Sequence, residues 1–197
     1  MNLGSRQFVF LLLLCLTFVS CESEYSQVVK RELKSGVIHE DLIFGMKMGQ
    51  TLKDFYDRCW ELNKQKLVSE GSGNRFAKHI MVLDSMAQNP ERVELLFYGI
   101  FDEEKIMHGM HMKLSYLKWA LWNEDYHAEP LMDNLQKKYI KDYPGNPFIE
   151  IDIDATKKAF VKVDGNRQIL MFPLSNKDVT VKIQDLRQPK SSTEQNR

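Results

Sequence analysis

The chain has 197 residues, of which 43% are hydrophobic and 27% are charged, and both fractions are ordinary for a folded domain. Its 27 basic and 27 acidic residues cancel, so no excess of positive charge favours nucleic acid as a partner. Two of the three cysteines, Cys15 and Cys21, lie at the N-terminus, which excludes a framework of disulfides. The length fits one domain, or two small ones in close contact.

Residues 1–20 are expected to be a signal peptide. Arg6 precedes an apolar run, Phe8–Val19, that is 12 residues long. A membrane-spanning helix needs about 20 residues. A run of this length behind a basic residue is typical of the hydrophobic region of a signal peptide.

Cys21 is the expected lipidation site. It follows Ser20 directly after the apolar run, and this pattern resembles the lipobox of bacterial lipoproteins, with Phe18 where leucine is usual. The resemblance implies that the chain is cut before Cys21 and that acyl chains such as palmitate hold the protein on the membrane. An ordinary signal peptide, cut after Cys21 with Val19 as the small residue at −3, is the alternative.

Residues 21–40 are polar and mixed, with no sustained period, and are expected to form a lipid-anchored tether. Glu22 and Glu24 follow the cysteine, and acidic residues at this place resemble the surface-export signals of some Bacteroidetes-type lipoproteins. The folded domain is expected to span residues 41–186, with a first strand near Asp41–Phe44.

The segment Phe44–Val68 predicts the first helix of the domain. Its apolar side chains fall at i, i+3, i+7 and i+10, which is one stripe of a helix, and these are Leu52, Phe55, Cys59 and Leu62. Tyr56 and Trp60 are expected to widen that stripe. Thr51 and Asp54 form a capping box with Asp in place of Glu.

Three strands are expected after this helix, over residues 77–83, 93–101 and 106–116. In the third, alternate residues should share one face, and these are Ile106, His108, Met110, Met112, Leu114 and Tyr116. The polar run Asp102–Lys105 is expected to be the hairpin turn before it.

The segment Lys118–His127 has no clear period and is expected to be irregular. Pro130 then opens a second helix in its first turn, where a missing N–H costs nothing. A drifting stripe at a spacing of four follows, made of Leu131, Leu135, Tyr139 and Tyr143. Pro144 and Gly145 end this helix.

Four further strands are expected, over residues 148–154, 159–163, 168–172 and 179–183. In the first, the inward-facing residues should be Ile149, Ile151 and Ile153. Asp164–Asn166 predicts a tight hairpin between the second and the third. Residues 187–197 are polar and are expected to form a disordered tail.

The order of helix, three strands, helix and about four strands predicts an α+β fold, in which antiparallel sheet carries two main helices on one face. The connections between strands are too short for parallel crossovers. The element order also allows two tandem helix-plus-meander units, although no repeat of individual residues supports them.

The stretches FGMKMGQTLKDFYDRCWELNK and AFVKVDGNRQI resemble a group of uncharacterised Bacteroidetes lipoproteins, over residues 41–186. This resemblance implies an envelope lipoprotein, and it implies no activity and no catalytic residue. A Gly-Met step before a helix and a meander also resembles the small outer-membrane assembly lipoproteins and the β-lactamase-inhibitor-protein-like folds.

The residues predict no catalytic site, no metal site and no cofactor. The five histidines are His39, His79, His108, His111 and His127. His108 and His111 are three apart on a predicted strand, so they face opposite ways and can share a metal only across a bulge at Gly109. Cys59 lies on the buried stripe of its helix, where a thiol is a small, inert hydrophobe.

Glu150, Asp152 and Asp154 share one strand face, and three carboxylates in a row can bind calcium. A solvated face is favoured instead, because the spacing and the glycine of a calcium loop are missing. The lysines that could pair with these carboxylates are Lys157, Lys158 and Lys162.

Trp119, Trp122 and Tyr126 are the candidate partner-binding residues. Aromatic side chains beside polar ones suit a binding edge. Of the two tryptophans, Trp122 is expected to be the more exposed, because the polar run begins directly after it. Packing of this segment over the core is the alternative.

The preferred interpretation is a non-enzymatic protein, anchored by its N-terminal lipid in a bacterial envelope, at the outer membrane on its periplasmic side or at the surface. Its partner would be an unknown envelope macromolecule. The second interpretation is a hydrolase or transferase of envelope polymers with acids among Asp84, Glu124, Asp125, Asp152 and Asp154, which a pocket joining two of them would favour. The third is a periplasmic inhibitor or immunity protein.

Overall fold

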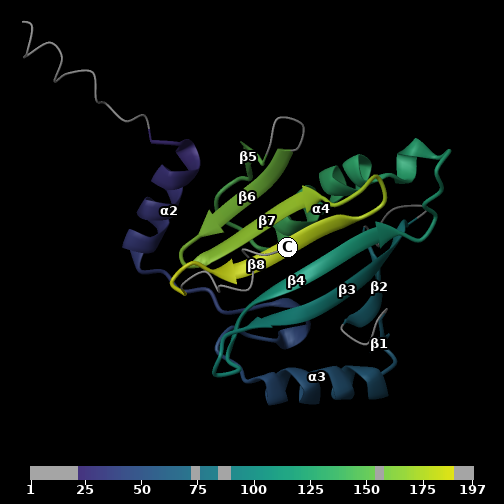
Figure 1. Ribbon diagram of the computed structural model, residues 1–197, viewed down its shortest axis with the longest axis horizontal. Coiled ribbons are helices and arrows are strands. Elements are labelled where there is room, and N and C mark those ends of the chain that lie inside the picture. The colour runs from purple at the N-terminus through teal and green to yellow at the C-terminus, as the bar shows by residue number, and fades with distance from the viewer. Residues whose placement is uncertain (1–21, 72–75, 84–89, 154–157, 189–197) are drawn as a thin grey trace, which may run out of the picture.

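The computed structural model describes residues 22–71, 76–83, 90–153 and 158–188 (Figure 1). The helices and 3-10 turns are α2 (Glu24–Ser35), η1 (Ile43–Gly45), α3 (Leu52–Lys64), η3 (Glu124–Tyr126) and α4 (Ala128–Asp142). The strands are β1 (Ser69–Glu70), β2 (Ala77–Val82), β3 (Arg92–Phe101), β4 (Met107–Tyr116), β5 (Ile149–Asp152), β6 (Lys158–Asp164), β7 (Arg167–Pro173) and β8 (Val179–Asp185). The expected signal peptide, Cys21 and residues 189–197 of the expected tail lie outside the described residues.

The strands form one antiparallel sheet in the order β1-β2-β3-β4-β8-β7-β6-β5. It consists of two meanders, β1–β4 and β5–β8, whose last strands pair at the centre of the sheet (Figure 1). α3 precedes the first meander and α4 precedes the second. The predicted α+β fold is confirmed, and its elements follow one another as two helix-plus-meander units.

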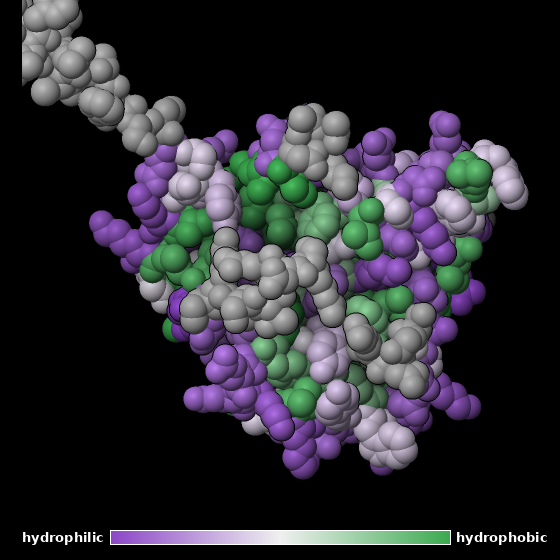
Figure 2. All heavy atoms as spheres, in the orientation of Figure 1, coloured by the Kyte–Doolittle hydropathy of each residue, from purple (hydrophilic) through white to green (hydrophobic). Residues whose placement is uncertain are grey.

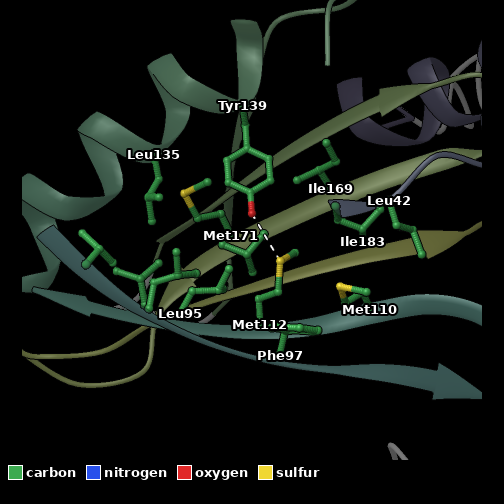
Figure 3. Packing of buried hydrophobic residues seen from close by; sticks show 14 of the residues in the cluster. Leu42, Leu95, Phe97, Met110, Met112, Leu135, Tyr139, Ile169, Met171 and Ile183 are labelled. Atoms are coloured by element: carbon green, nitrogen blue, oxygen red, sulfur yellow. Dashed lines mark hydrogen bonds between the residues drawn. The ribbon is translucent and has the colours of Figure 1, made fainter. Parts of the chain in front are cut away.

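The main hydrophobic core lies between one face of the sheet and the helices α3 and α4. At its centre Met110 pairs with Ile183 and Met112 pairs with Val181 across β4 and β8, and all four side chains are fully buried. Tyr139 of α4 donates a hydrogen bond from its hydroxyl to the Met112 Sδ atom at 3.4 Å (Figure 3). α3 contributes to the same cluster, so the two main helices share one face, as predicted.

α3 begins as predicted, but its aromatic side chains divide. Thr51 and Asp54 exchange hydrogen bonds between side chain and backbone, which completes the capping box. Phe55 is buried, whereas Tyr56 and Trp60, expected to widen the buried stripe, are 53% and 62% exposed. The expectation was wrong because these two positions lie about 100° and 140° around the helix from Phe55, beyond the sector that the sheet covers.

Residues 24–35, expected to be part of an irregular tether, form the helix α2. Ser23 caps its start by accepting a hydrogen bond from the Ser26 N–H, and Gly36 ends it in the left-handed conformation at φ 70°. The chain therefore becomes helical three residues after Cys21.

α2 covers part of the other face of the sheet. Val28 packs on Val161 and Val163 of β6, and the Tyr25 hydroxyl donates a hydrogen bond to the Gln168 side chain. Because residues alternate along a strand, this face is opposite to the one that α4 covers. In Figure 2, hydrophobic residues gather over β5 and β6 beside α2, while hydrophilic ones line the periphery.

No strand occurs at the place expected for the first one. Asp41 and Lys47 form only an isolated bridge, and η1 lies between them. Phe44 takes the left-handed conformation at φ 58°, and its ring centroid lies 5.2 Å from that of Phe97 in β3. The chain therefore turns here, and it packs the Phe44 ring against the core instead of adding a strand to the sheet.

The predicted strands of the first half are confirmed as β2, β3 and β4, with one irregularity. The pairing of β3 with β4 shifts at His108, which is the extra residue of a β-bulge. Met107 is fully buried in the core as a result. Ile106 and His108 therefore do not share the face of Met110 as expected, whereas the alternation holds from Met110 onward.

The second half follows its prediction closely. The expected stripe is buried, with Leu131, Leu135 and Tyr139 on α4 and Tyr143 directly after its end. β6 and β7 are joined by the expected two-residue turn. Ile153 is the exception, because it lies just beyond β5 and is half exposed. Only Ile149 and Ile151 pack against the cluster under α2.

The turn between β6 and β7 lies inside a polar network. Gly165 has φ 55°, and a Cβ atom there would lie 2.3 Å from the Val37 carbonyl oxygen, so only glycine fits. Lys162 is completely buried, with its ammonium 2.8 Å from the Asp164 carboxylate, and it also donates a hydrogen bond to the Asn146 carbonyl oxygen. This network fixes the hairpin against the chain on both sides of it.

Candidate functional site

The loop 117–127 displays one of the three predicted aromatic residues. Ala120 and Asn123 form an isolated bridge, and the Asn123 N–H donates a hydrogen bond to the Ala120 carbonyl oxygen at 3.0 Å. This tight turn places Leu121 and Trp122 at its apex, where they are 67% and 88% exposed. Trp122 is the most exposed large hydrophobic residue in the part of the chain that the structure describes.

Trp119 and Tyr126 hold the loop in place instead. The Tyr126 hydroxyl donates a hydrogen bond to the Glu91 carboxylate at 3.1 Å, and its ring meets that of Tyr116 edge-on at 5.3 Å. Trp119 is half-buried against the core, and the Lys177 ammonium lies 5.4 Å from its ring centroid. The structure therefore separates the predicted trio into two anchoring rings and one displayed ring.

A hollow of about 530 Å³ lies between this loop, the start of α4 and the β7–β8 connection. It brings together two of the predicted acids, Glu124 and Asp125, and adds Glu129, which sequence reasoning missed. Asp152 lies on the edge strand β5 and not in this hollow. The remaining predicted acids, Asp84 and Asp154, lie outside the described residues.

The carboxylate face of β5 is solvated, as expected. Glu150 and Asp152 are exposed, and Glu150 pairs with Lys158 on the neighbouring strand. Lys162 does not join them because it is buried in the network at the β6–β7 turn. Of the three predicted lysines, Lys158 pairs with these carboxylates and Lys162 does not. Lys157 lies outside the described residues.

The histidines do not converge on a metal site. A bulge at Gly109 was the condition for His108 and His111 to share a metal. The bulge occurs one residue earlier, at His108. His79 and His127 each contact a backbone carbonyl oxygen through a ring nitrogen, at 2.7 Å and 3.1 Å. In residues 22–71, 76–83, 90–153 and 158–188 no group of three possible metal ligands occurs.

Sequence reasoning missed a cleft of about 360 Å³ between α3 and the strands β1–β3. Its lining is mainly apolar and consists of Phe55, Tyr56, Cys59, Trp60, Asn63, Val68, Ser69, Glu70, Phe76, Ala77 and Tyr98. Cys59 forms part of the wall, and its burial raises the pKa of the thiol to about 11, which disfavours the reactive thiolate. The sequence signal that could have revealed this cleft is the width of the apolar stripe on α3. With Tyr56 and Trp60 included, the stripe is wider than one sheet can bury.

Comparison with protein-family models, with curated proteins and with solved structures gives no match to this chain. The class of protein that the fold defines is an α+β domain with one eight-stranded antiparallel sheet. Its function is therefore inferred from the geometry of these side chains.

Proposed function

We propose that this protein is a lipid-anchored binding protein of a bacterial cell envelope, which holds another macromolecule through the loop 117–127. The observation that carries the proposal is the exposure of Trp122, at 88%, on a loop whose other two aromatic rings are fixed. A large aromatic side chain held in water is unfavourable in the free protein, and its burial by a partner recovers that free energy.

The rigid mounting of Trp122 favours binding further. Trp119 and Tyr126 pack against the core and hold the turn at Ala120 and Asn123. A side chain presented on an ordered loop loses little conformational freedom when a partner binds it. Tryptophan is also enriched among residues that dominate the binding free energy of protein interfaces.

The start of α2 supports an anchor close to the membrane. If Cys21 carries lipid, only Glu22 and Ser23 separate it from the helix that packs on the sheet. The first turn of α2 and the loop 117–127 both lie on the upper side of the molecule in Figure 1. No helix in the described residues is long and apolar enough to cross a membrane. With a lipid at Cys21, the domain would meet its partner at the bilayer surface.

The anchor is tested with Cys21→Ser. We expect wild-type protein in the membrane fraction to incorporate labelled palmitate, and the variant to be soluble or unprocessed and unlabelled. Equal membrane retention of a correctly processed variant would disprove the anchor.

The binding surface is tested by capture from detergent-solubilised envelope. Trp122→Ala should keep its melting temperature and lose its partner, because truncation of a central interface tryptophan typically costs about 2 kcal/mol or more. Ile140→Ala is the matched control, since Ile140 is a half-exposed apolar residue on the outer side of α4. Equal capture by the two variants would contradict the proposal. Capture of a secreted or periplasmic enzyme that loses activity on binding would identify an inhibitor or immunity protein.

A second candidate function is hydrolysis or group transfer on an envelope polymer. The observation that favours it is the hollow that unites Glu124, Asp125 and Glu129, because two carboxylates in one cavity can serve as acid and base. Purified protein would be incubated with peptidoglycan and envelope polysaccharide. Turnover lost in both Glu124→Gln and Asp125→Asn would establish an enzyme, and absence of turnover in wild type would exclude it for those substrates.

A further inference from the structure

The cleft beside α3 is a second site, separate from the loop 117–127. Its floor is closed and apolar, since Phe55 and Val68 are buried and Cys59 is half-buried. Its volume of about 360 Å³ lies within the range of small-molecule sites, roughly 300–1,000 Å³. Residues of α3 line one side of it, and residues of β1, β2 and β3 line the other. Figure 1 shows how α3 lies along these strands.

Aromatic rings dominate the lining of this cleft. They are Phe55, Tyr56, Trp60, Phe76 and Tyr98. Tyr56 and Trp60 are one helical turn apart on α3, and each is more than half exposed. The Tyr56 and Tyr98 hydroxyl oxygens lie 3.5 Å apart across the cleft. The faces of such rings carry negative charge density and attract cations.

The charged groups around the cleft favour one sign of charge on the ligand. Among the described residues that line the cleft, Glu70 carries the only carboxylate, and none is a lysine or an arginine. The Lys64 ammonium, outside the lining, lies 5.4 Å from the Trp60 ring centroid, so this ring already attracts a cation. A carboxylate beside aromatic faces favours an organic cation and disfavours an anion such as a fatty acid.

We propose that the cleft beside α3 binds a small organic cation of the quaternary ammonium type. Its alkyl groups pack against Cys59 and Val68, and its charge lies against the faces of Trp60 and Tyr56 with Glu70 at the rim. A quaternary ammonium fits better than a lysine side chain of the protein itself, because a primary ammonium is strongly hydrated and an alkylated one is not.

The proposal is tested by titrating the full chain with choline and with 3,3-dimethyl-1-butanol, which has the same shape with carbon in place of the charged nitrogen. Ligand-observed NMR measures both dissociation constants. We expect choline to bind about 5–30-fold more tightly than the alcohol. Choline should also slow alkylation of Cys59 at pH 9, followed by mass spectrometry of the peptide that contains it.

Three variants separate charge from shape. Trp60→Ala should weaken choline binding about tenfold, and Glu70→Gln should weaken it severalfold. Lys64→Gln removes a positive charge near the Trp60 ring, so it should strengthen choline binding and leave the alcohol unaffected. Trp122→Ala is the control and should bind choline as wild type does. Circular dichroism confirms that each variant is folded, which is expected because the changed side chains are exposed.

Three results would overturn the proposal. The first is equal affinity for choline and the alcohol, which would indicate an apolar cleft without selection of charge. The second is no binding of choline and no protection of Cys59. The third is a choline affinity that Trp60→Ala and Glu70→Gln leave unchanged, which would place the ligand elsewhere.

Discussion

The two helices that begin the two halves of the molecule differ in how they use their aromatic residues. Tyr139 of α4 and Tyr143, which directly follows this helix, are both buried and stack at 5.7 Å between ring centroids. α3 occupies the corresponding place before the first meander, but it leaves Tyr56 and Trp60 largely in solvent beside a cleft. The two tyrosines at α4 are therefore packed into the core, whereas the two aromatic residues of α3 leave room for a ligand beside them.

This difference shows that a repeated arrangement of elements does not imply a repeated role. Both helices pack on one hydrophobic core, so both contribute to stability. The displayed side chains lie elsewhere, beside the cleft at α3 and on the loop 117–127 that joins the two halves. We therefore expect substitutions of the buried core residues in either half to change folding, and substitutions at the displayed rings to change binding.

The largest expected effect is the truncation of a core side chain on either helix. Phe55→Ala should lower the free energy of unfolding by about 3–5 kcal/mol, and Leu135→Ala by about 2–5 kcal/mol, because each leaves a cavity in the shared core. Phe55 is 1% exposed and its ring lies against those of Phe97, Tyr98 and Phe101. Urea unfolding measures both. A Phe55→Ala protein of nearly wild-type stability would mean that α3 is not part of the core.

The buried network at the β6–β7 turn should be almost as sensitive. Asp164→Ala leaves Lys162 and Arg167 buried without their carboxylate, and breaking such a pair costs about 3–5 kcal/mol. Asp57→Ala is the control, because Asp57 pairs with Lys53 on the exposed side of α3, where a pair contributes about 0–1 kcal/mol. Similar denaturation midpoints for the two variants would contradict the structural role of this network.

Sequence reasoning succeeded where a pattern is long and its turns are distinctive. The stripes of α3 and α4 were predicted because several apolar residues repeat one helical period. The Gly165–Asn166 turn was predicted because its residues are typical of tight hairpins. α2 was missed because its contact with the sheet rests on only a few side chains around Val28. The burial of Lys162 depends on a partner 16 residues away, the Asn146 carbonyl oxygen, which no local pattern reveals.

The candidate sites were harder to predict than the elements. Trp122 was correctly expected to be exposed, because polar residues follow it directly. Trp119 and Tyr126 were grouped with it, since neighbouring aromatic residues look alike before their partners are known. The cleft beside α3 was missed because Tyr56 and Trp60 are apolar enough to count as core in a sequence.

Cys59 offers a smaller test of the closed floor of the cleft. With a pKa of about 11, raised by burial, only about one thiol in a thousand is ionised at pH 8. Since the thiolate is the reactive form, iodoacetamide should label native Cys59 far more slowly than the unfolded chain, and the rate should rise steadily from pH 8 to pH 10. Labelling of native protein at the unfolded rate would contradict this environment.

The smallest expected effect on folding comes from the displayed rings. Trp60→Ala and Trp122→Ala should each change the free energy of unfolding by no more than about 0.5 kcal/mol, as is usual for exposed positions. Differential scanning calorimetry of both variants beside Leu135→Ala measures this contrast. A collapse of the melting temperature in Trp122→Ala would place that ring in the core and remove it from the binding surface.

The most direct test of the central claim is photo-crosslinking from position 122 in intact cells. A photoreactive phenylalanine would replace Trp122 in one strain and Ile140, also exposed and apolar, in another. We expect position 122 to form one dominant adduct with an envelope component, and position 140 to form none above background. The same adducts from both positions, or none from position 122, would contradict a binding surface on the loop 117–127.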